Sequence, residues 1–338
     1  MLSTTLINGI HNLYMKSESL NILRAVSILG VLIGHGCLQI GYEPVGRFCG
    51  YIFVQIFFLL SAYLLGIKYG NTSIGISFLV KRWKRLSVVY YPFLIIVICS
   101  ILLLGGNVTW KNVFTHFTYT NYFLQDTLLG VPFGHLWYIS MMMLCYVSLL
   151  VLQKKTDSLF HGWWLLVLSV LTLCVCVVCL RNHIPCRIPI VVTSYLIVFK
   201  RAKDICSWFS KLKNIPVYIY TFTLLCNITC FGLFLYWNLN DKLLIRDIIV
   251  LITACSWLLF FMTALRDMKC GKVLGFISAI SFELYLVHHP FVLGDLSWLN
   301  VGTLTGNILI NSFLAIIVIF VGAFILNKIG KFTAKAIG

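Results

Sequence analysis

Ten long runs of predominantly apolar residues, separated by short polar segments, make up most of this sequence. A helix needs about 20 such residues to cross the hydrocarbon core of a lipid bilayer. Backbone polar groups must be hydrogen-bonded internally in lipid, and no run alternates as a β-barrel strand does, so we expect helices. The expected spans cover residues 20–42, 46–67, 86–105, 135–152, 161–180, 186–200, 215–236, 246–265, 273–293 and 304–327.

The composition also places the chain among integral membrane proteins. Hydrophobic residues make up 60% of it and charged residues 11%, whereas a soluble domain averages about 45–50% apolar and about 25% charged residues. We therefore predict an all-α, polytopic integral membrane protein with about ten transmembrane helices, in which residues 1–338 form a single transmembrane domain without an appended soluble domain. Lys16 precedes the first run, as in a signal peptide, but no small-residue cleavage site follows, so this run is expected to remain as an anchor.

The formal charge of +16 follows the loops of this predicted topology. Nineteen of the 26 Lys and Arg residues fall on alternate loops and on both tails, six fall on the opposite loops, and Arg24 lies within the first run. Under the positive-inside rule, this split predicts that both termini are cytoplasmic, in a multi-pass protein of the inner (plasma) membrane. The basic clusters are short and lack a motif on which bases stack, so we expect no nucleic-acid partner.

The thirteen cysteines do not form the pattern of a disulfide framework, because most of them lie inside apolar runs. Cys174, Cys176 and Cys179 are close enough in sequence to suggest a metal site. Cysteine is, however, also a small and adaptable apolar residue within helices. We therefore expect no metal site and no bound cofactor.

The first run carries two ionisable side chains, Arg24 and His35. Eleven residues of helix bring the second side chain to within about 20° of the first, with a rise of roughly 16–17 Å. Both therefore lie on one face, with Arg24 near the cytoplasmic end and His35 in the outer half. Arg24 has two interpretations, a side chain that reaches the inner headgroups and a functional group. His35 is too deep for the first interpretation and is expected to face a bundle interior or a wet cavity.

Further polar residues lie within or at the border of later runs. Glu283 is expected to pair with Arg24 or another cation, which is a structural role. His135 and His288 stand at the outer ends of their runs, where an ordinary interfacial histidine is one interpretation and a site residue is the other. The candidates are Ser61 in "IFFLLSAY", His135, Trp137 and Tyr138 in "GHLWYIS", and Glu283, Tyr285 and His288 in "SFELYLVHHP".

The segment "FLVKRWKRLSVVYYP" carries four basic residues, including Arg82 and Arg85, which are three positions apart. On a helix at the membrane surface, such a cluster is typical of contact with anionic lipids. The alternative is a pocket for a polyphosphate ligand, because the guanidinium fork matches the geometry of phosphate.

Residues 106–134 form the largest segment outside the expected spans, on the predicted outer side. The segment has many aromatic residues and few charges. It is therefore expected to lie at the interface or to re-enter the membrane, and the alternative is a surface on which a sugar ring stacks.

Five motifs, in order along the chain, resemble those of the acyltransferase-3 family of membrane-bound acyltransferases, of the polysaccharide O-acetyltransferase type. "LRAVSILGVLIGH" is similar to the Arg-x10-His first helix of that family, "FFLLSA" to its Phe-Phe-x-x-Ser-Gly element, and "RWKR" to its Arg-x-x-Arg loop. "HLWYIS" and "SFELYLVHHP" resemble its His-Leu-Trp and Tyr-Leu-x-His patterns. Each motif is weak alone, but five in this order are specific and cover essentially the whole chain. Ala62 departs from the pattern, since the family commonly has glycine there.

The resemblance implies transfer of an acyl group, typically acetyl, from cytoplasmic acyl-CoA to a hydroxyl of a cell-surface carbohydrate or its lipid-linked precursor. Arg24, Arg82 and Arg85 would bind the phosphates of acyl-CoA, the donor substrate. His35 would act as a general base or carry the acyl group covalently, and Ser61, Tyr138 or His288 would stabilise the oxyanion. The acceptor stays open between O-antigen, capsule, exopolysaccharide, peptidoglycan and small molecules, and the donor between acetyl and succinyl.

Two other classes of protein account for parts of this pattern. A transporter or flippase for a lipid-linked sugar or another anionic substrate would use Arg24 to hold a phosphate and His35 to relay protons. Such a protein does not require Arg82 and Arg85 beside the inner end of the first helix. A sensor or a structural membrane protein leaves His35 unexplained. The expected partners are therefore acyl-CoA, a carbohydrate acceptor and membrane lipids.

Overall fold

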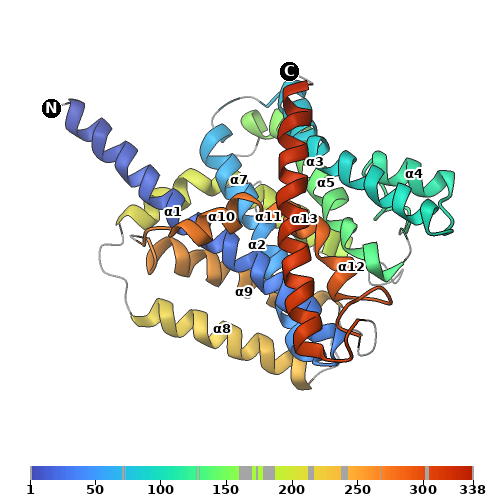
Figure 1. Ribbon diagram of the computed structural model, residues 1–338. Coiled ribbons are helices and arrows are strands. Elements are labelled where there is room, and N and C mark those ends of the chain that lie inside the picture. Colours follow the sequence, from blue (N-terminus) through green and yellow to red (C-terminus); the bar gives the residue numbers. More distant parts are fainter. Residues whose placement is uncertain are drawn as a thin grey trace. The chain divides into compact units, whose positions relative to one another are not determined.

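The structure is a computed structural model, and its described part consists of helices, turns and loops without any β-strand (Figure 1). The prediction of an all-α protein is therefore confirmed for these residues. The described residues are 2–70, 72, 74–126, 128, 130–159, 170–172, 174–177, 187–211, 217–236, 243–266, 268–300 and 304–336.

Seven stretches of helix in the described part of the chain are long and apolar enough to cross a membrane. Each overlaps one of the expected spans, so the chain has the helices of a polytopic membrane protein. They are Glu18–Gln39, Glu43–Tyr69, Ile76–Leu103, Pro132–Val151, Tyr218–Tyr236, Leu244–Thr263 and Ile308–Ala336. The elements that contain them are α1 (Leu2–Gln39), α2 (Glu43–Tyr69), α3 (Ile76–Leu103), η1 (Val131–Leu136) followed by α5 (Trp137–Leu159), α8 (Val217–Tyr236), α9 (Leu243–Thr263) and α13 (Ile308–Ala336).

The three remaining expected spans differ from those seven. Most of residues 161–180 lie outside the described part of the chain. Residues 186–200 overlap α7 (Arg187–Lys211), whose second half carries several charged residues. Residues 273–293 form three short helices in place of one, namely α10 (Lys272–Ala279), α11 (Ser281–Val287) and α12 (His289–Val292). This division places His288 at the junction of two helices.

The chain divides into two compact units. The first consists of Met1–Gly34, Pro44–Thr72 and Phe160–Ala279, and the second of His35–Glu43, Ser73–Leu159 and Ile280–Gly338. Helix α1 passes from the first unit to the second between Gly34 and His35.

Within the first unit, small residues let helices approach one another closely. A Cβ atom at Gly66 of α2 would lie 2.2 Å from the carbonyl oxygen of Phe199 in α7. A Cβ atom at Gly30 of α1 would lie 2.1 Å from the Phe53 ring of α2. Such contacts are typical of membrane bundles, where lipid provides no hydrophobic drive for helices to associate and close packing holds them together.

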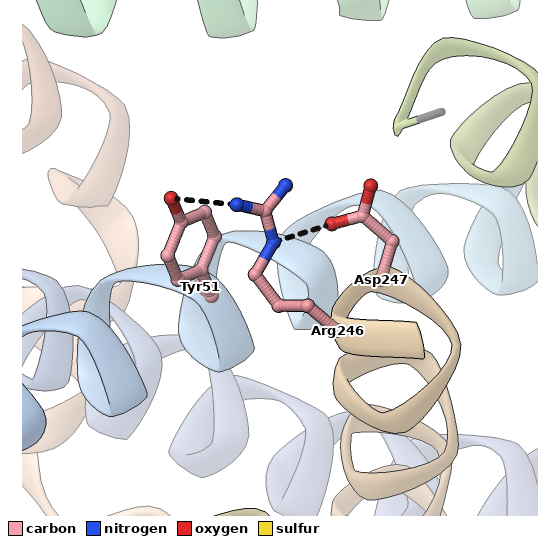
Figure 2. A network of polar contacts seen from close by, with 3 residues as sticks. All are labelled: Tyr51, Arg246 and Asp247. Atoms are coloured by element: carbon pink, nitrogen blue, oxygen red, sulfur yellow. Dashed lines mark hydrogen bonds and ion pairs between the residues drawn. The ribbon is translucent and has the colours of Figure 1, made fainter. Parts of the chain in front are cut away.

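The first unit also buries an ion pair at the start of α9. Nε of Arg246 donates to Oδ1 of Asp247 at 3.0 Å, and Nη1 of Arg246 donates to the Tyr51 hydroxyl at 3.4 Å (Figure 2). The guanidinium groups of Arg246 and Arg187 lie 4.7 and 4.4 Å from the centroid of the Tyr51 ring. Arg246 and Asp247 are both buried, so these desolvated charges depend on each other and on Tyr51 for compensation.

In the second unit, α13 packs against α3 and α11 (Figure 1). A Cβ atom at Gly330 would lie 2.7 Å from the Val89 side chain of α3, and one at Gly322 would lie 3.0 Å from Val287 of α11. Helix α12 packs against η1. These contacts bring the junction of α11 and α12 beside the start of α5.

The segment that follows α3 turns back along that helix. It contains the short helix α4 (Trp110–Phe117). The Tyr91 hydroxyl donates to the carbonyl of Phe117 at 2.9 Å, and the hydroxyls of Ser87 and Tyr119 lie 2.6 Å apart. Tyr91 precedes the end of α3 by twelve residues, which at the rise of a helix is roughly 18 Å. The segment around α4 is therefore held against the side of α3 within the second unit.

Candidate active site

Four histidine rings, those of His35, His135, His288 and His289, come together in the second unit. The rings of His35 and His288 are nearly parallel, and Nδ1 of His35 lies 2.8 Å from Nε2 of His288. The ring of His289 lies 4.6 Å from that of His35 and stacks on that of His135 at 4.5 Å. His35 is half-buried and the other three are buried. We refer to these four residues as the histidine cluster.

Backbone carbonyl groups determine which nitrogen atoms of the cluster carry hydrogen. Nδ1 of His288 lies 2.8 Å from the Tyr285 carbonyl oxygen and 3.1 Å from that of Leu284. A carbonyl oxygen only accepts, so Nδ1 of His288 must be the donor and its Nε2 is an acceptor in the neutral ring. Nδ1 of His35 must therefore donate to Nε2 of His288. The other nitrogen of His35, Nε2, keeps its lone pair and is the atom that can take a proton.

Gln39 holds the end of α1 about one helical turn after His35. The backbone N–H of Gly294 donates to Oε1 of Gln39 at 2.8 Å. Nε2 of Gln39 in turn donates to Oδ1 of Asn300. Because both ends of this amide are bound to the segment that follows α12, the last turn of α1 is fixed beside the His288 ring.

The elements η1 and α11 bind each other through backbone groups around His135. Nε2 of His135 donates to the Leu286 carbonyl at 3.1 Å, and the Tyr285 hydroxyl donates to the His135 carbonyl at 2.5 Å. Nδ1 of His289 donates to the Pro132 carbonyl at 3.1 Å. These reciprocal bonds fix the positions of the rings, which is what a preorganised site requires.

Most of the candidate residues from the sequence lie at this cluster. His35, His135 and His288 belong to it, and Tyr285 has its ring 5.3 Å from that of His135. The ring of Tyr138 lies 4.9 Å from that of Tyr285, and Trp137 lies beside Tyr138.

Two candidates lie in the first unit. The hydroxyl of Ser61 is 3.0 Å from that of Tyr195, and Nη1 of Arg24 donates to Oδ1 of Asn21 at 3.5 Å. Of the three expected oxyanion donors, His288 donates its N–H to backbone carbonyls and Ser61 belongs to the first unit, whereas Tyr138 lies beside the cluster.

Arg82 and Arg85 lie near the beginning of α3, in the second unit. The guanidinium of Arg82 lies 5.5 Å from the centroid of the Phe78 ring, and Arg85 is exposed. The two side chains are three residues apart on one helix, so they can bind one ligand together.

Glu283 of α11 is buried and has an amide as its direct partner. Nδ2 of Asn327 in α13 donates to its Oε1 at 2.6 Å. The sequence analysis expected a pairing of Glu283 with Arg24 or another cation, whereas this hydrogen bond joins Glu283 to the neutral amide of Asn327 and belongs to the packing of α11 on α13.

Two residues of this arrangement are absent from the candidates that the sequence provides, His289 and Gln39. His289 is visible in the sequence beside His288 before Pro290, but neighbouring residues on a helix point about 100° apart. In the structure both rings reach one cluster at the junction of α11 and α12, with their centroids 5.6 Å apart. Gln39 gives no sequence signal, because its partners lie 255 and 261 positions away.

The described part of the chain contains no group of three or more His, Cys, Asp or Glu side chains arranged to hold a metal ion. The cluster rings stack on one another and bind backbone carbonyls. Cys174 and Cys176 are among the described residues, whereas Cys179 lies outside them.

A family model described as an acyltransferase domain, that of acyltransferase-3, matches residues 17–328. The chain belongs to the acyltransferase-3 family. The match to this acyltransferase-3 domain includes every residue of the histidine cluster and all the arginine candidates. Membership identifies it as a membrane acyltransferase. No curated protein and no solved structure matches the chain closely enough for comparison.

Proposed function

We propose that this membrane acyltransferase moves an acyl group, typically acetyl, from cytoplasmic acyl-CoA to a hydroxyl group of a cell-surface carbohydrate or its lipid-linked precursor. The observation that supports this most directly is the bond from Nδ1 of His35 to His288, which leaves Nε2 of His35 with a lone pair. A neutral imidazole is well suited to accept a hydroxyl proton near neutral pH.

In the proposed reaction, Nε2 of His35 takes the proton of the acceptor hydroxyl while the oxygen attacks the thioester carbonyl carbon. The new C–O bond forms, the C–S bond breaks, and the sulfur of CoA leaves with the proton that His35 returns to it. His288 is a positioning residue, because it accepts from Nδ1 of His35 and stabilises the imidazolium that forms. Attack of the same His35 nitrogen on the thioester, with an acyl-histidine intermediate, is the second route.

The phosphate groups of the donor are proposed to bind Arg24, Arg82 and Arg85. Several phosphate charges on CoA favour arginine, whose fork makes charge-assisted, often bidentate, hydrogen bonds. In the proposed topology, these residues face the cytoplasm, where acyl-CoA is found.

The proposed topology has ten spans, with both termini in the cytoplasm and the protein in the inner (plasma) membrane. Residues 161–180, α7 and the three short helices α10 to α12 would add three crossings to the seven long ones. A broken helix is tolerated at membrane depth where it is buried in protein or lines a polar cavity, and the cluster residues at the α11–α12 junction support this interpretation.

Purified protein in lipid nanodiscs, incubated with acetyl-CoA labelled in its acetyl group, tests the proposal. We expect His35→Ala to bind acetyl-CoA about as well as the wild type but to transfer no label to the carbohydrate of membranes added as acceptor. Arg24→Ala should bind acetyl-CoA more weakly, and equal affinity would refute the proposed role of Arg24.

The opposite outcome identifies the competing class. If acetyl-CoA neither binds nor is consumed, and His35→Ala changes only the movement of a lipid-linked sugar across the vesicle membrane, the protein is a transporter. If label is transferred instead, mass spectrometry of surface polysaccharide from cells with and without the protein identifies the acceptor and distinguishes acetyl from succinyl groups.

A further inference from the structure

Within the described residues, Nδ1 of His135 in the histidine cluster is buried without a hydrogen-bond partner. His135 donates through Nε2 to the Leu286 carbonyl, so its neutral ring keeps a lone pair on Nδ1. This Nδ1 is buried and unbonded within the described structure, and the whole side chain is only 3% exposed. Buried polar atoms are nearly always hydrogen-bonded, so an exception requires an explanation.

The neighbouring rings present the same kind of atom. His289 uses Nδ1 to donate to the Pro132 carbonyl, which leaves its Nε2 as an acceptor. His35 uses Nδ1 to donate to His288, which leaves its Nε2 as an acceptor. All three neutral rings thus use their N–H on protein partners and retain only lone pairs. A set of acceptors without donors is complementary to a ligand that donates O–H or N–H groups.

We propose that Nδ1 of His135 is a substrate-binding atom, which accepts a hydrogen bond from an O–H or N–H group of a substrate held at His35. The proposal rests on the proposed function and adds to it a contact that holds the substrate. Two sources share this chemistry, namely a second hydroxyl of the carbohydrate acceptor and an amide N–H of the pantetheine arm of acyl-CoA. In both cases His135 orients the substrate and exchanges no proton with it.

The variant His135→Gln separates the two nitrogen atoms of this side chain. The glutamine amide nitrogen reaches the position of Nε2 and keeps the donation to the Leu286 carbonyl, but no acceptor remains at the position of Nδ1. A matched control is His116→Asn in α4. His116 is also buried, donates through Nδ1 to the Asn112 carbonyl at 2.8 Å, and has an unbonded Nε2 within the described structure. Asparagine keeps the donor at Nδ1 and removes that second lone pair.

Two measurements distinguish the sources of the donor group. Equilibrium binding of acetyl-CoA in nanodiscs reports on the pantetheine arm, and label transfer at saturating acetyl-CoA with increasing acceptor membranes reports on the carbohydrate. We expect His135→Gln to weaken one of the two about tenfold or more, as expected when a buried group loses its hydrogen-bond partner, with a smaller change in kcat. His116→Asn should stay within about twofold of the wild type in both.

The failure of this proposal is distinguishable from failure of the proposed function. If His135→Gln binds acetyl-CoA and depends on the acceptor as the wild type does, the proposed role of Nδ1 is overturned. If, in the same experiments, the wild type transfers label and His35→Ala does not, the proposed function still holds. If His135→Gln does not fold, His135→Asn provides the second test, because its amide oxygen restores an acceptor near Nδ1. His135→Asn should then bind both substrates like the wild type, and weaker binding of both would also overturn the proposal.

Discussion

At the scale of single residues, the proposed chemistry depends on which nitrogen atom of each histidine carries hydrogen. The carbonyls of Leu284 and Tyr285 determine the tautomer of His288, and His288 determines that of His35. The two backbone carbonyls, acting through His288, therefore determine which nitrogen of His35 has a lone pair that can accept a proton. His35 would be a poor base if its hydrogen were on Nε2, because that atom would then be a donor.

Two substitutions of His288 test this dependence. In His288→Gln, the side-chain amide lies near the position of Nε2, and its oxygen can still accept from Nδ1 of His35. In His288→Asn, the amide lies near Nδ1, so no acceptor remains for His35. We expect label transfer to stay within about tenfold of the wild type in the glutamine variant and to fall by about 10²–10⁴-fold in the asparagine variant, the range of general-base catalysis.

The measurement is the rate of label transfer at saturating acetyl-CoA, with acetyl-CoA binding as the check that the site is intact. Equal rates in the two variants would show that the bond between His35 and His288 does not determine activity.

At the scale of the elements, the packing of α2 on α7 depends on a glycine. A Cβ atom at Gly66 would meet the Phe199 backbone at 2.2 Å, whereas one at Gly50 of the same helix would meet nothing within 4 Å. Gly66→Ala should therefore push the two helices apart and lower the free energy of unfolding by about 1–3 kcal/mol. Gly50→Ala should have little effect or stabilise the protein by up to about 1 kcal/mol, because alanine is the better helix former.

Thermal and denaturant unfolding in detergent, followed by circular dichroism, compare the two variants. A Gly66→Ala variant as stable as Gly50→Ala would contradict the close approach of α2 and α7.

The long helices follow from the sequence because bilayer thickness sets their length. A run such as residues 46–67 predicts α2 directly, since a helix needs about 20 apolar residues to cross the hydrocarbon core of a bilayer. The division of residues 273–293 does not follow in this way, because a hydropathy average over the run does not register the break at Ile280. Pro290 is a local signal of the second break, since proline lacks the N–H that a helix interior requires.

The histidine cluster could be predicted only in part from the sequence, for a related reason. Helical spacing relates residues within one element, so it places Arg24 and His35 on one face of α1. It says nothing about the bond between His35 and His288, which joins residues 253 positions apart. It also does not reveal Gln39, whose amide has no spacing pattern and acts through backbone and side-chain partners in another segment.

At the scale of the whole molecule, reporter fusions test whether the chain crosses the membrane ten times or fewer. Alkaline phosphatase fused within residues 181–185 should be active, because these residues are expected outside, and the same enzyme fused within residues 204–213 should be inactive. A fluorescent protein fused after residue 338 should be fluorescent, as expected for a cytoplasmic end. Activity at both internal fusion points would mean that residues 186–200 do not cross the membrane.

The two units are interleaved along the chain, with helix α1 contributing His35 to the unit that ends at Gly338. A ribosome adds about 5–20 residues per second, so the first helix enters the membrane roughly 10–50 s before His288 exists, 253 positions later. During that interval His35 has no acceptor for its N–H, and Gln39 has neither Gly294 nor Asn300 to bind. Nascent or truncated chains therefore contain the proposed base without the contacts that direct its N–H, and these contacts form only when synthesis is almost finished.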